Sequence, residues 1–375
     1  MYDAIVIGTG GVGSAALYHL ARRGFKVLGL DRFGPGHDQG SSHGQTRIIR
    51  LSYFEHPDYV PLLRDAYSLW DELGEARAED LFHRTGLVYF GEPGGTVIQG
   101  LLASANKHAL EMQQLGEAEA VQLYPGYAAP PGASILYEEN AGYLRVEECV
   151  RAHIEEAVRL GAEHRHCESV ICWKATDASV SVLTDQGSYE AARVIVTAGC
   201  WTKNLLDELK IPLRIVRKHL HWFASGQDHY REDRGCPCFF YQTNGGMFYG
   251  FPDVDGGGVK VAEHSGGTEI WDPLGDGREE EPEDTGRIKE FLSRYLPGVS
   301  MNRKRREVCF YTMSPDENFI VDRHPEYESV VFAAGLSGHG FKFASALGKT
   351  LVEMAMDGKA KREIGFLGLD RLRSK

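Results

Sequence analysis

The sequence has no long apolar run and no excess of positive charge. No stretch approaches the ~18 consecutive apolar residues that a membrane-spanning helix needs, so we expect no membrane association. The 53 acidic residues outnumber the 41 basic ones, which gives a formal net charge of -12. Such a chain is poorly suited to binding nucleic acid through its phosphates. We therefore expect its partners to be small molecules.

Cysteine is scarce and has no framework spacing. The seven Cys are scattered along the chain, which excludes a small disulfide-stapled module. Pairs of His two residues apart, such as His219 and His221, fall short of the three or four converging ligands that zinc requires. No metal site is therefore expected. Because Met1 leads into an apolar strand with no basic leader, we expect a soluble, cytoplasmic protein.

The segment from residue 2 to 31 has the pattern strand, glycine turn, helix, strand. Gly8, Gly10 and Gly13 fit G-x-G-x-x-G, which provides a tight turn, close backbone approach to a pyrophosphate and close helix–strand packing. Asp31 ends the second strand, where a carboxylate can bind the ribose hydroxyls of an adenosine. This segment predicts a dinucleotide site and by itself leaves FAD and NAD as alternatives.

Two further features favour FAD. Residues 187–201 form a predicted strand ending in Ala198-Gly199, as does the strand that returns to the first nucleotide strand in many flavoproteins. A nicotinamide enzyme would usually continue after Asp31 with another strand–helix unit. Here a stretch rich in Gly, Ser and His follows instead.

That stretch, residues 32–58, is too long and irregular for an ordinary connection, so we expect it to be functional. His43, Arg47 and Arg50 lie within it, and the alternative is a solvated polar loop. An amphipathic helix follows, with Trp70 on its apolar face and a predicted end at Gly74. Its apolar face is expected to belong to the core.

The C-terminal part contains a predicted strand, residues 330–334, then a glycine-rich loop and a helix. The loop places Ser337, His339 and Lys342 at the start of this helix. A helix N-terminus carries partial positive charge and free N–H groups. It could stabilise the negative charge that gathers on one edge of a reduced flavin.

Five motifs together identify a family resemblance: "GTGGVG", "GSSHGQTRIIR", "YGFP" followed by "KVAEH", "CFYTMSPDENFIVD" and "SGHGFK". Over nearly its whole length the chain resembles the monomeric sarcosine oxidase and N-methyltryptophan oxidase family of FAD-dependent amine oxidases. The resemblance implies an α/β fold, α+β overall. In this fold a Rossmann-like FAD-binding domain is joined to a substrate domain built on a mixed β-sheet.

The resemblance also implies roles for single residues. Cys309 corresponds to the cysteine whose sulfur is joined to the 8α-methyl of the flavin, and Arg305 and Arg306 just before it could favour its thiolate. Arg50 and Lys342 correspond to the clamp of the substrate carboxylate. Further catalytic positions are Arg47 at the flavin face, His43 beside it, Lys260 as the residue that activates oxygen, and Tyr249, His264 and Tyr311. Tyr249 is also expected to contact the substrate. The expected FAD contacts are Gly8, Gly10, Gly13, Asp31, Ser42, His43, Arg47, Gly199, Cys309, Gly338, His339, Gly340, Phe341 and Lys342.

The FAD-binding domain is expected to be discontinuous. It comprises residues 1–85, 145–215 and 306–375, with the substrate-binding domain at 86–144 and 216–305. Strand-like runs such as "HLHWFAS" and "GGMFYGF" suit a sheet over the flavin. A helix over 145–160 resumes the first domain, and a further helix is predicted over 288–296, behind the acidic run "REEEPEDTG".

The expected function is oxidation of a small secondary amino acid such as sarcosine. Hydride passes to FAD, the imine is hydrolysed, and O2 is reduced to hydrogen peroxide. Alternatives are N-methyltryptophan, pipecolate, proline or a glycated amino acid as substrate, or a flavin dehydrogenase with another electron acceptor. A flavin- or nucleotide-binding protein without catalysis is the rival class. It would have no reason to combine Arg50, Lys260, Cys309 and Lys342. A monomer is the habit of the family.

Overall fold

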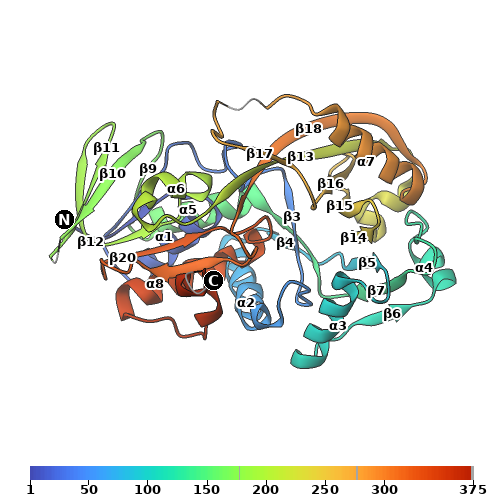
Figure 1. Cartoon of the computed structure of the whole chain (residues 1–375), viewed down its shortest axis with the longest axis horizontal. Coiled ribbons are helices and arrows are strands. Elements are labelled where there is room, and N and C mark those ends of the chain that lie inside the picture. Colours follow the sequence, from blue (N-terminus) through green and yellow to red (C-terminus); the bar gives the residue numbers. More distant parts are fainter. Residues whose placement is uncertain (177, 276–277, 373–375) are drawn as a thin grey trace.

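The computed structural model describes residues 1–176, 178–275 and 278–372. The predicted domain ranges also include the few remaining residues, which lie outside this description. The chain forms two lobes, each built on one large sheet (Figure 1). Segments from the N-terminus, the middle and the C-terminus of the chain meet in the first lobe, so its sheet is discontinuous in sequence.

The first lobe is a mixed sheet with helices packed on it. Its strand order is β10-β11-β12-β1-β2-β9, with β20 beside β12 and β19 beside β20. The predicted strand within residues 187–201 does return to the first strand, because β12 pairs in parallel with β1, and β20 pairs in parallel with β12. The strands are β1 (Tyr2–Ile7), β2 (Val27–Leu30), β9 (Glu163–Arg165), β10 (Val170–Ala175), β11 (Val180–Thr184), β12 (Ser188–Val196), β19 (Ile320–Arg323) and β20 (Val330–Ala334).

Helix α1 lies between α5 and α8 and packs closely against both. The approach to α8 depends on small residues, since a Cβ on Gly348 would lie 2.6 Å from the Cβ of Ala15. The apolar faces of these helices and of α2, including Trp70 as predicted, form one buried cluster with β1 and β20. The helices are α1 (Gly11–Arg22), α2 (Val60–Arg77), α5 (Val146–Arg159) and α8 (Ala344–Asp357).

The second lobe is a nine-stranded sheet in the order β17-β13-β16-β15-β14-β5-β7-β6, with β18 paired to β13. It is mixed, because β14 pairs in parallel with β5 while the other pairs are antiparallel. Its strands are β5 (Leu87–Gly91), β6 (Gln113–Leu115), β7 (Ser134–Glu138), β13 (Arg214–Ser225), β14 (Cys238–Thr243), β15 (Gly246–Asp253), β16 (Val259–Glu263), β17 (Thr268–Ile270) and β18 (Val299–Met313).

Short elements complete the fold. A three-stranded sheet in the order β3-β8-β4 consists of β3 (Thr46–Ile49), β4 (Phe82–His83) and β8 (Gly142–Arg145). The remaining α-helices are α3 (Thr96–His108), α4 (Glu117–Leu123), α6 (Thr202–Leu205) and α7 (Pro282–Tyr295). The 3-10 helices are η1 (Pro57–Tyr59), η2 (Gly199–Trp201), η3 (Asp207–Leu209), η4 (Asp228–Tyr230), η5 (Glu232–Arg234), η6 (Phe341–Phe343), η7 (Gly365–Leu367) and η8 (Leu369–Leu372).

Two predicted helix boundaries are wrong. Helix α2 does not stop at Gly74 but continues to Arg77, because one glycine inside a helix costs only about 1 kcal/mol, and it ends where Ala78 turns left-handed (φ 52°). Helix α7 begins at Pro282 rather than near residue 288. The acidic run supplies its first turn, where proline is tolerated and carboxylates favour the helix dipole.

The structure also differs from the predicted irregular stretch at 32–58 and from the predicted domain boundary at residue 306. Residues Thr46–Ile49 are not irregular but form β3, which pairs antiparallel with β8. The expected domain boundary at residue 306 falls inside β18, which pairs along β13 in the second sheet. Cys309 is therefore on a strand of the second lobe that reaches the first.

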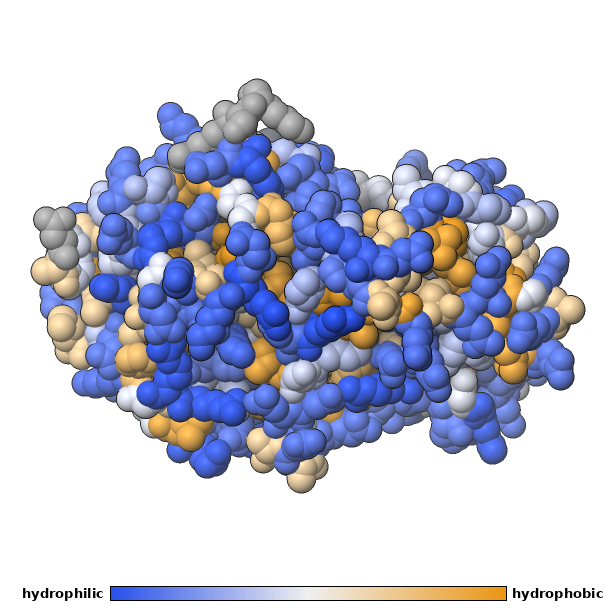
Figure 2. Space-filling view, turned by 90° about the horizontal axis from the view of Figure 1, so that it is seen from below, coloured by the Kyte–Doolittle hydropathy of each residue, from blue (hydrophilic) through white to orange (hydrophobic). Residues whose placement is uncertain are grey.

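The face of the molecule seen from below (Figure 2) is mainly polar. Hydrophilic side chains cover most of the face shown in Figure 2, and apolar residues on it form small separate groups. None of the helices in the described ranges combines the length and apolar character needed to cross a membrane.

Candidate functional site

One large cavity, of about 380 Å³, lies where the two lobes meet. It extends from the glycine turn before α1 to Tyr249 and His264 of the second lobe. Of the predicted site residues, sixteen line it: Gly8, Gly10, Asp31, Ser42, Arg47, Arg50, Gly199, Tyr249, His264, Cys309, Tyr311, Gly338, His339, Gly340, Phe341 and Lys342. Gly13, His43 and Lys260 do not line it and lie behind its wall.

The glycine turn has the geometry that a pyrophosphate site needs. Gly8 has φ 84°, and a Cβ on it would lie 2.7 Å from the Thr197 carbonyl oxygen. A Cβ on Gly13 would lie 1.8 Å from the Gly8 carbonyl oxygen, so Gly13 serves helix–strand packing. Helix α1 begins at Gly11, whose N–H donates to Ser42 Oγ at 3.1 Å. The N-terminus of α1 therefore faces the cavity, as anion binding requires.

Asp31 directly follows β2 and lines the cavity. It accepts hydrogen bonds from Thr9 N at 2.7 Å and from Phe33 N at 2.9 Å. These bonds fix the carboxylate beside the glycine turn and leave further acceptor capacity. Because the first residues of α1 line a cavity that continues to Cys309, the residues fit FAD: Asp31 would hold the ribose and α1 the pyrophosphate.

Cys309 is adjacent to Arg47. Arg47 Nη2 lies 3.1 Å from Cys309 Sγ and also donates to Ser41 O at 3.0 Å. The prediction that Arg305 and Arg306 serve this thiol is wrong. Arg305 is paired with Glu307, and Arg306 contacts His219 Nδ1 at 3.1 Å on the other face of the sheet. Alternate residues of a strand face opposite sides, so Arg306 faces away from Cys309. The cation in contact with the sulfur is Arg47 of β3.

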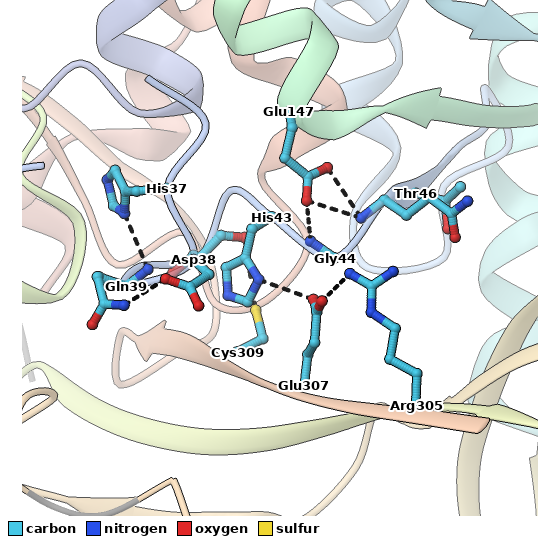
Figure 3. A network of polar contacts seen from close by, with 12 residues as sticks. His37, Asp38, Gln39, His43, Gly44, Thr46, Glu147, Arg305, Glu307 and Cys309 are labelled. Carbon is cyan, nitrogen blue, oxygen red and sulfur yellow. Dashed lines mark hydrogen bonds and ion pairs between the residues drawn. The ribbon is translucent and has the colours of Figure 1, made fainter. Parts of the chain in front are cut away.

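His43 is buried next to the same strand. Its Nδ1 lies 3.3 Å from Glu307 Oε2, as Figure 3 shows. Burial acts to raise the pKa of Glu307, but its bonds to His43 and Arg305 hold that pKa at about 2. The sequence around His43 did not indicate this carboxylate partner, which comes from a distant segment of the chain.

Arg50 already binds a carboxylate. Both oxygens of Glu55 lie 2.8 Å from Arg50 Nη2. The guanidinium also lies over the rings of Phe54 (4.3 Å) and Tyr53 (4.7 Å). Burial acts to raise the pKa of Glu55, but Arg50, followed by His339 and Lys342, lowers it. Sequence reasoning missed Glu55, although an acid five residues after Arg50 in a functional loop was the available signal.

Lys342 supplies the second cation on this side of the cavity. Its Nζ donates to His339 O at 2.9 Å. Burial and then the charge of Arg50 lower the pKa of Lys342 to about 7. An anion placed between Arg50 and Lys342 would reverse the second effect, so the pair is suited to bind a carboxylate.

Three polar rings form the far end of the cavity. The hydroxyls of Tyr249 and Tyr311 are 3.5 Å apart, and Tyr311 Oη lies 3.5 Å from His264 Nδ1. Burial lowers the pKa of His264 to about 3, so this ring is neutral at pH 7. Gly338 (φ 80°) lets the C-terminal loop approach, because a Cβ there would lie 2.3 Å from the Tyr311 ring.

Lys260 lies behind the cavity wall on β16. Its Nζ donates to Thr46 O at 2.8 Å, to Thr46 Oγ1 at 3.1 Å and to Gly44 O. Burial and then Arg47 lower its pKa well below the usual value. Lys260 of β16 therefore binds the backbone of β3, the short strand that carries Arg47.

Comparisons with known proteins agree over the whole chain. The family model for FAD-dependent oxidoreductases of the DAO type matches residues 3–354. The chain is 38% identical to monomeric sarcosine oxidase from Arthrobacter sp. (strain TE1826), covering 99% of this chain and 96% of the relative. It is 37% identical to N-methyl-L-tryptophan oxidase from Yersinia pestis (strain Pestoides F), covering 99% and 100%.

Solved structures match the fold. NikD, an amino acid oxidase of nikkomycin biosynthesis, superimposes with a TM-score of 0.86 at 23% identity and covers 98% of this chain and 97% of that one. Glycine oxidase from Geobacillus kaustophilus gives 0.82 at 17% identity, with 98% of each chain covered. The predicted fold class is therefore confirmed.

Proposed function

Because the chain belongs to the DAO family of FAD-dependent oxidoreductases, we propose that it is an oxidase of a small secondary amino acid, with sarcosine as the first substrate to test. The predicted dependence on FAD is confirmed by family membership. When bound, FAD supplies the hydride acceptor, and O2 is the proposed final acceptor, giving hydrogen peroxide.

The observation that carries this proposal is the bidentate contact between Arg50 and Glu55. It supports a site that binds a carboxylate beside a second cation, Lys342, and beside the cavity that extends to Cys309. A substrate carboxylate would replace that of Glu55 in the same geometry. The neighbouring Tyr249 and neutral His264 would orient the amine without adding charge.

The cavity wall beside this clamp is aromatic. The rings of Phe54 and Phe240 lie 5.4 Å apart, both line the cavity, and Arg50 lies close to both. This wall is compatible with the small apolar N-methyl group of sarcosine. An aromatic side chain could also stack there, and the similarity to N-methyl-L-tryptophan oxidase makes N-methyltryptophan the second candidate.

We also propose covalent attachment of FAD through Cys309. In support, Cys309 lines the cavity and its sulfur lies 3.1 Å from Arg47 Nη2, at the end of the cavity away from the glycine turn. The assignments of Lys260 to oxygen activation and of His43 to the flavin edge stay proposals of the same kind.

We also propose the domain boundaries, a monomeric state and a cytoplasmic location. The first sheet has strands in all three segments of the proposed FAD-binding domain, 1–85, 145–215 and 306–375, and the second sheet supports a substrate-binding domain at 86–144 and 216–305. Strand β18 crosses the proposed boundary at 306 and pairs in the second sheet. The relatives are named monomeric, which favours a monomer. All seven cysteines lie in the described ranges and are free, which suits the cytoplasm.

The test is peroxide release from the purified protein with sarcosine, N-methyltryptophan, pipecolate and proline. We expect sarcosine to give the highest kcat/KM. Arg50→Met should lower that value roughly 10- to 100-fold, since hydrogen bonds to charged groups contribute about 1.5–3 kcal/mol. Arg22→Met, at an exposed ion pair with Glu72, is the matched control. Substrate turnover with an artificial acceptor but no peroxide would identify a dehydrogenase instead.

A further inference from the structure

A strained turn precedes β3. Gly44 has φ 89° and Gln45 has φ 68°, and the left-handed conformation is costly for a residue with a side chain. Both N–H groups point to one carboxylate. Gly44 N donates to Glu147 Oε1 at 2.7 Å, and Gln45 N lies 3.0–3.1 Å from the two oxygens. Figure 3 shows Glu147 reaching this turn from the first turn of α5. Successive N–H groups of this kind form an anion site.

The carbonyl side of the same turn points to Lys260. Its Nζ donates to Gly44 O and Thr46 O. The peptide group that joins Gly44 to Gln45 therefore has its N–H on Glu147 and its C=O on Lys260. An anion at one end and a cation at the other polarise this group in the same sense, and each bond strengthens the other.

Lys260 needs a nearby negative charge to stay an ammonium. Its side chain is 1% exposed, and the rings of Phe251 and Trp222 lie 4.6 Å and 5.2 Å from Nζ. Four charged or titratable groups act on it from the elements packed around it. Arg47 of β3 disfavours the ammonium, whereas Glu147 of α5 and Glu307 and Cys309 of β18 favour it. Buried charges of this kind persist only when they are compensated.

We propose that Glu147 is a positioning residue that keeps Lys260 in its ammonium form through the Gly44–Gln45 peptide, and thereby maintains reactivity with oxygen. No proton passes between the two side chains. When an electron passes from the reduced cofactor to O2, the superoxide formed is an anion, and a fixed ammonium stabilises it. The inference rests on the proposed function, in which O2 is the acceptor and Lys260 acts at the flavin.

The main test uses Glu147→Gln, whose amide oxygen can still accept from both N–H groups but carries no charge. Glu148→Gln is the matched control, because Glu148 is the next residue of α5 and is half-exposed near Arg151. The holoenzyme is reduced anaerobically with substrate and mixed with O2, and the second-order rate constant is measured from pH 6 to pH 9. Flavin reduction by substrate is measured separately.

We expect Glu147→Gln to slow the reaction with O2 at pH 8 by about tenfold or more, because most copies of the variant would then carry a neutral Lys260 at that pH. Because loss of the anion makes the ammonium easier to deprotonate, the rate should recover as the pH is lowered. Flavin reduction should change less than about twofold. Glu148→Gln should match the wild type. In the Lys260→Met background, Glu147→Gln should cause no further loss.

A spectroscopic readout is independent of turnover. The visible absorbance of the oxidised holoenzyme is titrated with pH, since a cation lost near the flavin shifts its bands. Glu147→Gln should move the transition to lower pH, and Lys260→Met should abolish it. If Glu147→Gln folds poorly, the same comparison is made in a Gln45→Gly background, where the left-handed turn costs little.

The possible failures are distinct. If Lys260→Met reacts with O2 at the wild-type rate, the proposed role of Lys260 in oxygen activation is wrong, and so is the inference about Glu147. If Lys260→Met is slow while Glu147→Gln follows the wild-type pH profile and titration, the inference alone is overturned, and Glu147 only supports the turn.

Discussion

Glu55 occupies the guanidinium of Arg50, with both carboxylate oxygens 2.8 Å from Nη2. The two residues lie at the two ends of one short loop and both line the cavity. A substrate carboxylate that binds Arg50 must therefore compete with a carboxylate of the protein itself, which sets an upper limit on substrate affinity.

Glu55→Gln should relieve this competition. A neutral amide holds Arg50 less strongly than a carboxylate, so we expect the KM for an N-methyl amino acid to fall by about three- to tenfold with little change in kcat. Steady-state peroxide assays check this. Glu72→Gln, at the exposed pair with Arg22, is the control. A higher KM would instead mean that Glu55 contacts the substrate, for example through its amine.

Cys309→Ser should release the flavin. The wild-type protein is expected to keep its yellow colour in an acid precipitate, whereas the variant should lose it to the supernatant because an alcohol does not replace the thiolate as a nucleophile. Cys200→Ser is the matched control, since Cys200 is also buried and lines the same cavity. Colour that washes out of the wild type would disprove the covalent link.

Gly338→Ala should lower both stability and activity, and it should lower stability more than the same change at a comparable glycine, Gly358. Gly338 and Gly358 have similar left-handed angles, φ 80° and φ 82°, but a Cβ at 338 meets the Tyr311 ring whereas one at 358 meets nothing within 4 Å. Gly358→Ala should therefore cost about 1 kcal/mol of unfolding free energy from backbone strain alone. Gly338→Ala should cost about 2 kcal/mol or more and should lower kcat. Denaturant unfolding and peroxide assays compare the two. Equal costs would show that the Tyr311 ring moves freely.

Buried His19 should make the protein acid-labile. Burial, followed by Lys349 and Arg22, lowers the pKa of His19 to about 3, whereas an exposed histidine in the unfolded chain has a pKa of about 6.5. Between these values the unfolded state binds a proton that the folded state excludes, so stability falls as the pH drops below 6.5. From pH 7 to pH 5 this group should cost about 2 kcal/mol. His19→Leu should remove that part of the pH dependence, and exposed His166→Gln should not. Unfolding at both pH values tests the difference.

The sequence predicted the parts of the site that depend on backbone geometry. Local features predict these positions. Gly8 and Gly13 lie in a turn with no room for a Cβ, and Asp31 is a carboxylate at the end of a strand. The partners of the cations were not predictable in the same way. Glu147 and Glu307 reach Gly44 and His43 from distant segments, and no local pattern marks them. The starts of β3 and α7 were missed because pairing with β8 and the acidic first turn outweigh weak local propensity.

The first sheet has a consequence for how the protein is made. Strand β1, which leads into Gly8, is synthesised first together with its neighbour β2. Its other neighbour β12 ends at Val196, and β12 also pairs with β20, which ends at Ala334. Cys309 and Lys342 come equally late. Most of the chain must therefore be synthesised before the sheet around the nucleotide motif can be completed. Because parallel pairing over such separations is slow, we expect the cofactor to bind only after translation. A chain truncated before β18 would keep the glycine turn but lack Cys309 and Lys342.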